Sequence, residues 1–252
     1  MKKLTLSIFT FFIVLSAMAT GGKEQKAHNQ APTNTLTVQS TSQNAPASPN
    51  FPGSLVFDFG FNFLNDAPED MKLNFFGSKI FNLYYMYEIR LGNSAFSFNP
   101  GLGVGLEKYR FDKDVTLAST NEGTAIVPLS ENWDVKKSKL AANYVDIPIE
   151  LRFHANKNNF RKSFKVGVGA KAGILFNSHS KIKYKENGDT KTLKSKEPFD
   201  LNRFRYGLQG RIGIGGFSVF YYHELSSLFK DGKGPEGTDA SPYKVGISLY
   251  AF

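Results

Sequence analysis

The chain has 252 residues, enough for one barrel- or sandwich-sized domain, and a formal net charge of +9. The absence of cysteine excludes disulfides, iron–sulfur clusters, thiolate metal sites and a lipid-modified cysteine. Aromatic residues make up 14% of the chain, with 24 Phe and 11 Tyr against a single Trp. Beyond the N-terminal segment, no run approaches the roughly 20 apolar residues of a membrane helix.

The N-terminal segment is typical of a secretory signal peptide. Met1-Lys2-Lys3 is basic, residues 4–15 are mostly apolar, and Ala17-Met18-Ala19 predicts cleavage after Ala19. A membrane anchor is the alternative, but the apolar run is short and no stop-transfer pattern follows. Residues 20–52 are rich in Asn, Gln, Ser, Thr, Ala and Pro without an apolar period, which predicts a disordered linker.

The segment from Tyr144 to Phe153 alternates strictly in polarity. Its odd positions are apolar, whereas its even positions include Asp146, Glu150 and Arg152. Successive side chains of a strand point to opposite faces, so one face of this strand is apolar and the other is charged. A water-soluble sheet buries such an apolar face, whereas a membrane barrel turns it towards lipid.

The same alternation recurs throughout residues 53–252, the predicted barrel domain. Eight strands are expected at residues 54–63, 80–91, 96–109, 144–153, 164–176, 203–214, 217–225 and 243–252. Each is about as long as a tilted crossing of a bilayer requires. The predicted fold is therefore all-β, an eight-stranded antiparallel up-and-down transmembrane barrel, whose closure leaves no unpaired edge in lipid.

The connections between these strands alternate in length. Residues 92–95, 154–163 and 215–216 form short turns, whereas residues 64–79, 110–143, 177–202 and 226–242 form long links. Outer-membrane barrels have short periplasmic turns and longer outer loops. The sequence therefore predicts an outer-membrane location, long loops outside the cell and both termini in the periplasm.

Three features resemble the outer-membrane β-barrel domain of the Bacteroidota type, whose best-known members are PorT-like proteins. They are the segment Tyr144–Ile149, the glycine-alternating segment Pro100–Gly105 and the terminal Phe252. The resemblance covers roughly residues 51–252 and implies an eight-stranded barrel in the outer membrane, but no single activity. In a typical barrel-assembly signal the terminal Phe lies on the lipid face of the last strand. Phe252 instead falls on the same face as Lys244, opposite Leu249, which indicates a bulge, a lumen-facing cap or a weakened assembly signal. Pro148 lacks the N–H for a ladder hydrogen bond and predicts an irregularity in its strand.

The lumen-facing positions carry the main candidate site, a structural charge network. An eight-stranded barrel is just wide enough for side chains to fill it, so charges inside must pair. Glu224 and Lys165 share the lumen-facing parity, and glycines on this face leave room for long side chains. The predicted network comprises Asp58, Glu88, Arg90, Glu107, Asp146, Glu150, Arg152, Lys171, Arg205 and Arg211. A small gated channel or a proton-linked acid pair is the alternative.

Catalytic, cofactor-binding and metal-binding residues are not predicted. The glycine-rich segments lack a following helix that would hold phosphate. Ser178-His179-Ser180 and His223-Glu224 are the candidates for a histidine-based hydrolase, but isolated histidines explain them more simply.

The sequence favours a non-enzymatic outer-membrane barrel with a structural, adhesion or complex-forming role and a closed lumen. The alternatives are a small channel or transporter and, less favoured, a lipid-modifying enzyme or protease. The expected partners are outer-membrane lipids and lipopolysaccharide, the barrel-assembly machinery through the C-terminal strand, and a protein of the envelope. Nucleic acid is not expected, because anionic lipid is the counter-charge that a basic secreted chain meets.

Overall fold

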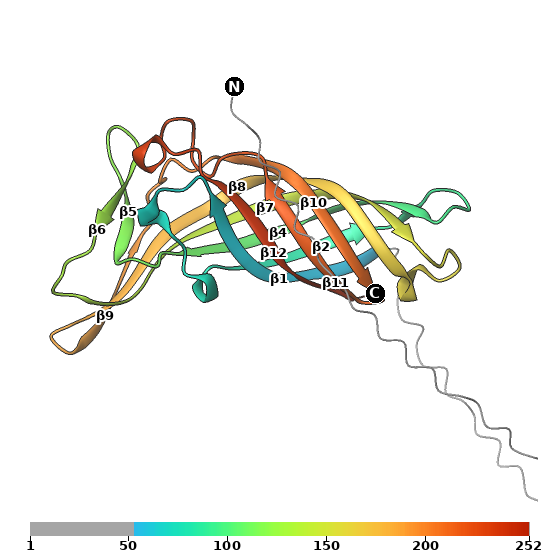
Figure 1. Cartoon of the computed structure of the whole chain (residues 1–252), viewed down its shortest axis with the longest axis horizontal. Helices are drawn as coiled ribbons and strands as arrows, with labels where there is room; N and C mark the ends of the chain where they lie inside the picture. The colour runs from blue at the N-terminus through green and yellow to red at the C-terminus, as the bar shows by residue number, and fades with distance from the viewer. Residues whose placement is uncertain (1–52, 252) are drawn as a thin grey trace, which may run out of the picture. The chain divides into compact units, whose positions relative to one another are not determined.

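The computed structural model describes residues 53–251, which belong to one compact unit (Figure 1). The predicted signal peptide, the predicted linker and Phe252 lie outside the described residues. Within residues 53–251, no helix is long and apolar enough to cross a membrane.

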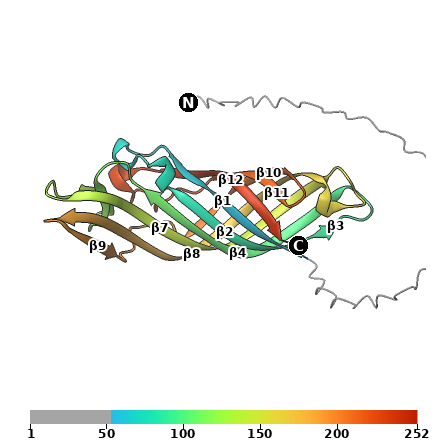
Figure 2. The same ribbon diagram turned by 90° about the horizontal axis from the view of Figure 1, so that it is seen from below.

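Eight strands form a closed antiparallel ring, which confirms the predicted fold class (Figures 1 and 2). Each strand pairs with the next one along the chain, and the pairing of β12 with β1 closes the ring. In ring order the strands are β1 (Gly53–Asn65), β2 (Lys79–Tyr87), β4 (Phe96–Arg110), β7 (Asp134–His154), β8 (Phe164–Glu186), β10 (Phe204–Ile214), β11 (Phe217–Glu224) and β12 (Ser241–Ala251).

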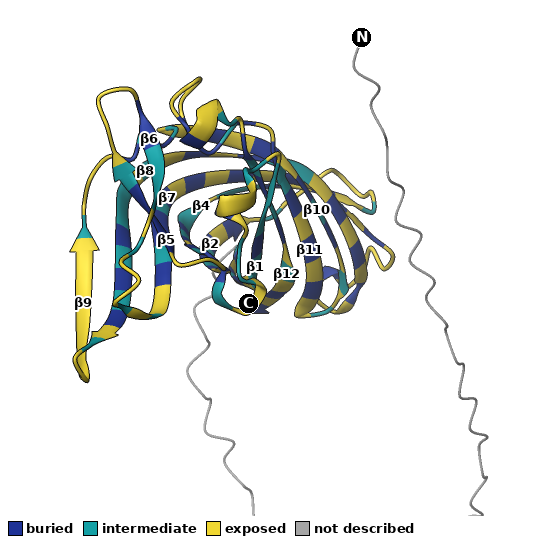
Figure 3. Ribbon diagram, turned by 60° about the vertical axis from the view of Figure 1, so that its left-hand side comes forward, coloured by how far each residue is buried: buried dark blue, intermediate teal, exposed yellow. Residues whose placement is uncertain are grey.

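The ring has apolar side chains outside and charged side chains inside. On β7, Ile147 is 57% exposed, whereas the neighbouring Asp146 is fully buried. The same alternation of buried and exposed residues bands the other strands (Figure 3). Burying charges while exposing Leu, Ile and Phe is unfavourable in water and favourable in a bilayer. The outward apolar band of the ring is called the lipid belt below.

The long links contain structure that polarity alternation did not reveal. β7 begins about ten residues before the predicted strand, and β8 ends ten residues after it. Two strands, β5 (Val115–Ser119) and β6 (Thr124–Pro128), form a separate hairpin, and β9 (Asp189–Ser195) pairs with the end of β8. The smaller elements are β3 (Ile89–Arg90) and the single-turn helices η1 (Glu69–Met71), η2 (Phe75–Gly77), η3 (Phe160–Lys162) and η4 (Pro235–Gly237).

Two irregularities change the pairing of β7. The ladder between β4 and β7 is interrupted between the pairs Pro100–Ile149 and Gly103–Asp146, beside Pro148, which has no N–H to donate. On the other side, β8 contains an extra residue at Phe176, between the pairs Asn143–Asn177 and Tyr144–Leu175. Because of this bulge, the inward positions of β8 change from odd to even numbers along the strand.

An apolar core lies at the end of the ring where the long links meet. The cluster joins strand residues to loop residues far away in sequence. It comprises Met71, Tyr109, Phe111, Val115, Leu117, Leu140, Ala142, Tyr144, Phe199, Leu201, Leu228 and Phe229. The long links thus fold onto one another by burying apolar surface, and they cover the inner charged layers from this end.

Candidate functional site

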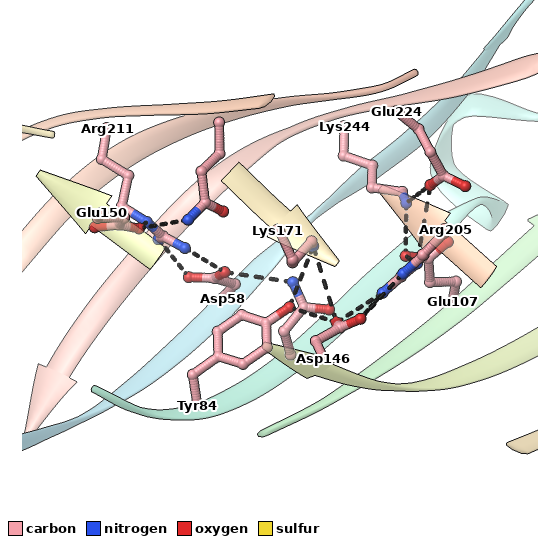
Figure 4. A network of polar contacts seen from close by, with 12 residues as sticks. Asp58, Tyr84, Glu107, Asp146, Glu150, Lys171, Arg205, Arg211, Glu224 and Lys244 are labelled. Atoms are coloured by element: carbon pink, nitrogen blue, oxygen red, sulfur yellow. Dashed lines mark hydrogen bonds and ion pairs between the residues drawn. The ribbon is translucent and has the colours of Figure 1, made fainter. Parts of the chain in front are cut away.

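The interior of the ring holds two ion clusters. The first, the Arg205 cluster, joins Arg205 on β10 to Asp146 on β7, Glu107 on β4, Lys244 on β12 and Glu224 on β11 (Figure 4). Asp146 accepts hydrogen bonds from Nη2 and Nε of Arg205 at 2.7 and 3.1 Å. Arg205 Nη1 also donates to Glu107, while Lys244 Nζ lies 2.7 Å from Glu107 Oε1 and 2.8 Å from Glu224 Oε2.

Tyrosine rings surround this cluster and supply further hydrogen bonds. The Tyr84 hydroxyl donates to Asp146 Oδ2 at 2.9 Å and accepts from Lys171 Nζ at 3.2 Å. The guanidinium carbon of Arg205 lies 3.6 Å from the ring centroid of Tyr144, a cation–π contact. The first cluster is therefore enclosed by aromatic side chains rather than by water-facing surface.

Glycine makes room for the central ion pair. A Cβ atom at Gly105 would lie 2.6 Å from Arg205 Nη2 and 2.7 Å from Asp146 Oδ2. Either distance is a steric clash, so a side chain at this position would displace the salt bridge. The glycine alternation of β4 thus has a physical cause on the inner face of the ring.

The second cluster, the Arg211 cluster, lies nearer the short-turn end. Arg211 donates from both terminal nitrogens to Asp58 at 2.7 and 2.9 Å and from Nε to Glu150 at 2.6 Å. Glu150 also accepts from Arg152 Nε at 2.7 Å and from Gln209 Nε2 at 2.9 Å. Bidentate contacts between guanidinium and carboxylate groups are strong and geometrically specific, so this cluster ties β1, β7 and β10 together.

The structure brings eight of the ten predicted network residues into these two clusters or, for Lys171, against their edge. Glu88 and Arg90 differ from the prediction, because Glu88 lies between β2 and β3 and Arg90 ends β3, both at the short-turn end. Glu88 approaches His154 at 3.9 Å, and Arg90 is exposed with its guanidinium over the Phe160 ring. Lys244 completes the Arg205 cluster but was absent from the prediction, although its parity with Gly246 and Ser248 placed it on the inner face.

The histidine pairings suggested by sequence do not assemble a hydrolase site. His179 lies on the outer face of the extended β8, whereas the adjacent Ser180 is buried on the inner face. His223 contacts the Tyr221 hydroxyl, while Glu224 turns inward to Lys244. Alternation along a strand separates the members of each pair.

A serine–histidine contact that the sequence did not indicate lies at the short-turn end. Ser97 Oγ is 3.0 Å from His154 Nε2, and Asn99 Nδ2 donates to Ser97 Oγ at 2.8 Å. Ser97, Asn99 and His154 are nearly fully buried on the inner face. The hydrogen bond between Ser97 and His154 joins β4 to β7 at the short-turn end of the lumen.

The inner face nearly balances its own charge. Among the described residues, the buried carboxylates are Asp58, Glu107, Asp146, Glu150 and Glu224, and the buried cations are Arg152, Lys165, Lys171, Arg205, Arg211 and Lys244. Within residues 53–251, no group of three His, Cys, Asp or Glu side chains is placed to hold a metal ion. The arrangement of these charges joins strands across the lumen by salt bridges.

A closed ring with a lipid belt and a charged interior defines an outer-membrane β-barrel protein. The chain belongs to the family described as outer membrane protein beta-barrel domain, which it matches over residues 42–230. Comparison with curated proteins gave no match.

Among solved structures, the chain is similar to Ail, the attachment invasion locus protein of Yersinia pestis. One Ail structure, in complex with the heparin analogue sucrose octasulfate, has 12% sequence identity and a TM-score of 0.36, with 80% of this chain and 100% of that chain covered. A second Ail structure has 14% identity and a TM-score of 0.34, with 79% and 97% covered.

Proposed function

We propose that this protein is a non-enzymatic component of the outer membrane, with a structural, adhesion or complex-forming role and a lumen closed by paired charges. The observation that carries the proposal is the pair of buried ion clusters centred on Arg205 and Arg211. Their side chains reach across the lumen from opposite strands and hold one another by salt bridges. A conducting lumen needs space and mobile charges, both of which such pairing opposes.

The complex-forming role is supported by the surface at the long-loop end. There β7 and β8 continue beyond the lipid belt, and β9 adds an exposed strand with one edge unpaired within the described sheet. An open strand edge offers backbone N–H and C=O groups to a partner chain. The β5–β6 hairpin adjoins the same surface, since Glu197, just beyond β9, accepts a hydrogen bond from the backbone N–H of Ser119.

The proposal also includes a narrower family assignment and the order of the segments along the chain. Residues 144–149 support membership of the PorT-like Bacteroidota group, and residues 1–19 and 20–52 are proposed as signal peptide and periplasmic linker. The C-terminal strand, β12, is proposed to contact the barrel-assembly machinery. Lipid, lipopolysaccharide and an envelope protein are the proposed partners of the mature chain.

Planar-bilayer recording of the refolded mature chain tests the closed lumen. We expect no steady conductance from the parent, because the ion clusters fill the lumen. Arg152→Ala should lower thermal stability without creating conductance. Steady channels in the parent, with selectivity altered by Arg152→Ala, would instead identify a small channel or transporter. Cross-linking in native membranes tests the complex-forming role, which predicts a reproducible protein partner at β9.

A further inference from the structure

The outer face of the extended sheet carries lysines on adjacent strands. We define the basic face as Lys108, Lys137, Lys139, Lys181, Lys183 and Lys194. Lys139 on β7 lies directly opposite Lys181 on β8, which in turn lies opposite Lys194 on β9. Lys137 likewise lies opposite Lys183. Directly opposite residues have Cβ atoms about 5 Å apart, so these ammonium groups share one small area.

Carboxylates of the described part of the chain do not compensate this charge. None of the six lysines forms a salt bridge within residues 53–251. The acidic groups near the sheet are occupied elsewhere, since Glu186 binds Lys191 and Trp133, and Asp134 binds Lys136. Like charges directly opposite across strands destabilise a sheet, so an external anion would relieve a real repulsion.

The basic face directly follows the lipid belt on the same strands and the same outer side. On β4, Leu102 is 58% exposed and Lys108 follows six residues later; on β8, Phe176 is 56% exposed and Lys181 follows five later. That separation is roughly 20 Å or less along a strand, and shorter along the membrane normal because barrel strands tilt by about 40°. The lysines therefore lie at the level of the polar headgroups that flank the hydrocarbon core.

We propose that the basic face is a binding site for the phosphate groups of phosphorylated glycolipids in the outer leaflet. The lysines supply ammonium donors for phosphate, and the apolar side chains below them, including Ile174 and Phe176, supply a surface for acyl chains. A soluble polyanion would use the lysines alone. The lipid is favoured because the basic face is continuous with the belt. The inference rests on the proposed function together with the topology predicted from the link lengths, in which the long links lie outside the cell.

The test compares matched triple variants of the mature chain in phosphatidylcholine nanodiscs. Lys139→Gln/Lys181→Gln/Lys194→Gln removes the row across three strands. Lys72→Gln/Lys157→Gln/Lys162→Gln removes three exposed lysines outside the face, all without salt bridges among the described residues. The probe is diphosphoryl lipid A, titrated with native mass spectrometry as the readout. We expect the first variant to bind about 100-fold more weakly than the parent, and the second to bind like the parent.

Further measurements distinguish an effect of lysine charge from an effect on folding, and a lipid ligand from free phosphate. Replacing the same three lysines by Arg should keep binding, and the heat-modifiable band on a gel should show that every variant folds. Chemically dephosphorylated lipid A should bind far more weakly, and inorganic phosphate should not compete. Equal binding of lipid A to both Gln triples, or no binding to the parent, would overturn the proposal.

Competition with heparin tests whether a soluble polyanion, rather than a glycolipid, occupies the basic face. One outcome is that heparin binds the parent in solution as tightly as lipid A does, and that the Lys139→Gln/Lys181→Gln/Lys194→Gln variant loses affinity for both ligands equally. In that case the site belongs to a soluble polyanion and the lipid proposal is wrong. The conductance experiment is independent of these lysines. If the parent shows neither conductance nor lipid A binding, only the proposed lipid site is rejected. If the parent conducts, only the proposal of a closed lumen is rejected.

Discussion

Arg205 shows how a single buried residue holds several strands. Its side chain is fully buried and contacts carboxylates from β7 and β4, and the ring of Tyr144 covers its guanidinium group. A charge in this environment is stable only while its partners remain, because removing one partner leaves an uncompensated buried ion. Arg152 is less central, since its partner Glu150 keeps Arg211 and Gln209.

This difference predicts a graded loss of stability. Arg205→Ala should lower the free energy of unfolding by about 3–5 kcal/mol, and Arg152→Ala should fall at or below the lower end of that range. Urea unfolding in lipid vesicles would measure both. Adding Asp146→Asn to Arg205→Ala should restore part of the lost stability, because it removes one buried carboxylate that no longer has its cation. Arg205→Ala behaving like the exposed control Lys157→Ala would show that the lumen charges are hydrated rather than paired.

Residue parity along the sequence was enough to predict the inner and outer faces of the strands. Parity was not enough to predict which buried charges pair with each other. Arg211 and Asp58, for example, are 153 residues apart and meet only when the ring closes. The hairpin β5–β6 and the start of β7 at Asp134 were missed for a related reason. Apolar residues of β5 and β7 pack with distant loop residues such as Phe199 and Phe229, and such packing leaves no local polarity pattern.

At the scale of the strand, the lipid belt predicts a position-dependent cost for a new charge. Ile149 on β7 is 42% exposed within the belt, and Leu193 on β9 is 45% exposed beyond it. Ile149→Arg should destabilise the barrel in vesicles by roughly 2–4 kcal/mol, the cost near a bilayer midplane. Leu193→Arg should be close to neutral, because β9 lies outside the lipid. Similar effects on unfolding by urea would contradict the assignment of the belt.

The only tryptophan of the chain, Trp133, lies in the link just before β7 and packs against the tip of the β8–β9 hairpin. Its ring stacks on Tyr184 with centroids 3.9 Å apart, and its Nε1 donates to Glu186 at 2.9 Å. Asn187 and Gly188 close the hairpin with positive φ angles of 52° and 87°, as a two-residue turn requires. This contact fastens the long link before β7 to the hairpin.

Tryptophan fluorescence should therefore report the protonation of Glu186. Hydrogen bonds from Lys191 and Trp133 lower the pKa of Glu186, so the contact is fully present above the ordinary glutamate pKa of about 4.3 and is lost as pH falls through the lower folded value. We expect constant emission from pH 8 to 5 and a change only below that range. Glu186→Gln should abolish the acid transition, and a transition persisting in this variant would assign it to another group.

At the scale of the whole molecule, the lipid belt, the alternating link lengths and the basic face together define an orientation. The short turns lie at one end of the ring, and the folded long links lie at the other. The orientation proposed above places the long-link end outside the cell. The lysines of the basic face then face the outer leaflet, whose phosphates they are proposed to bind.

Single-cysteine labelling tests this orientation without interference, because the natural chain has no cysteine. Asn121→Cys in the β5–β6 turn and Asn158→Cys in the short turn before η3 are both exposed positions. A membrane-impermeant maleimide applied to intact cells should label Asn121→Cys and leave Asn158→Cys unlabelled until the outer membrane is opened. Both should react equally in detergent, which controls for accessibility. Labelling of Asn158→Cys alone on intact cells would invert the orientation, place the basic face against the inner leaflet and contradict the outer-leaflet glycolipid site.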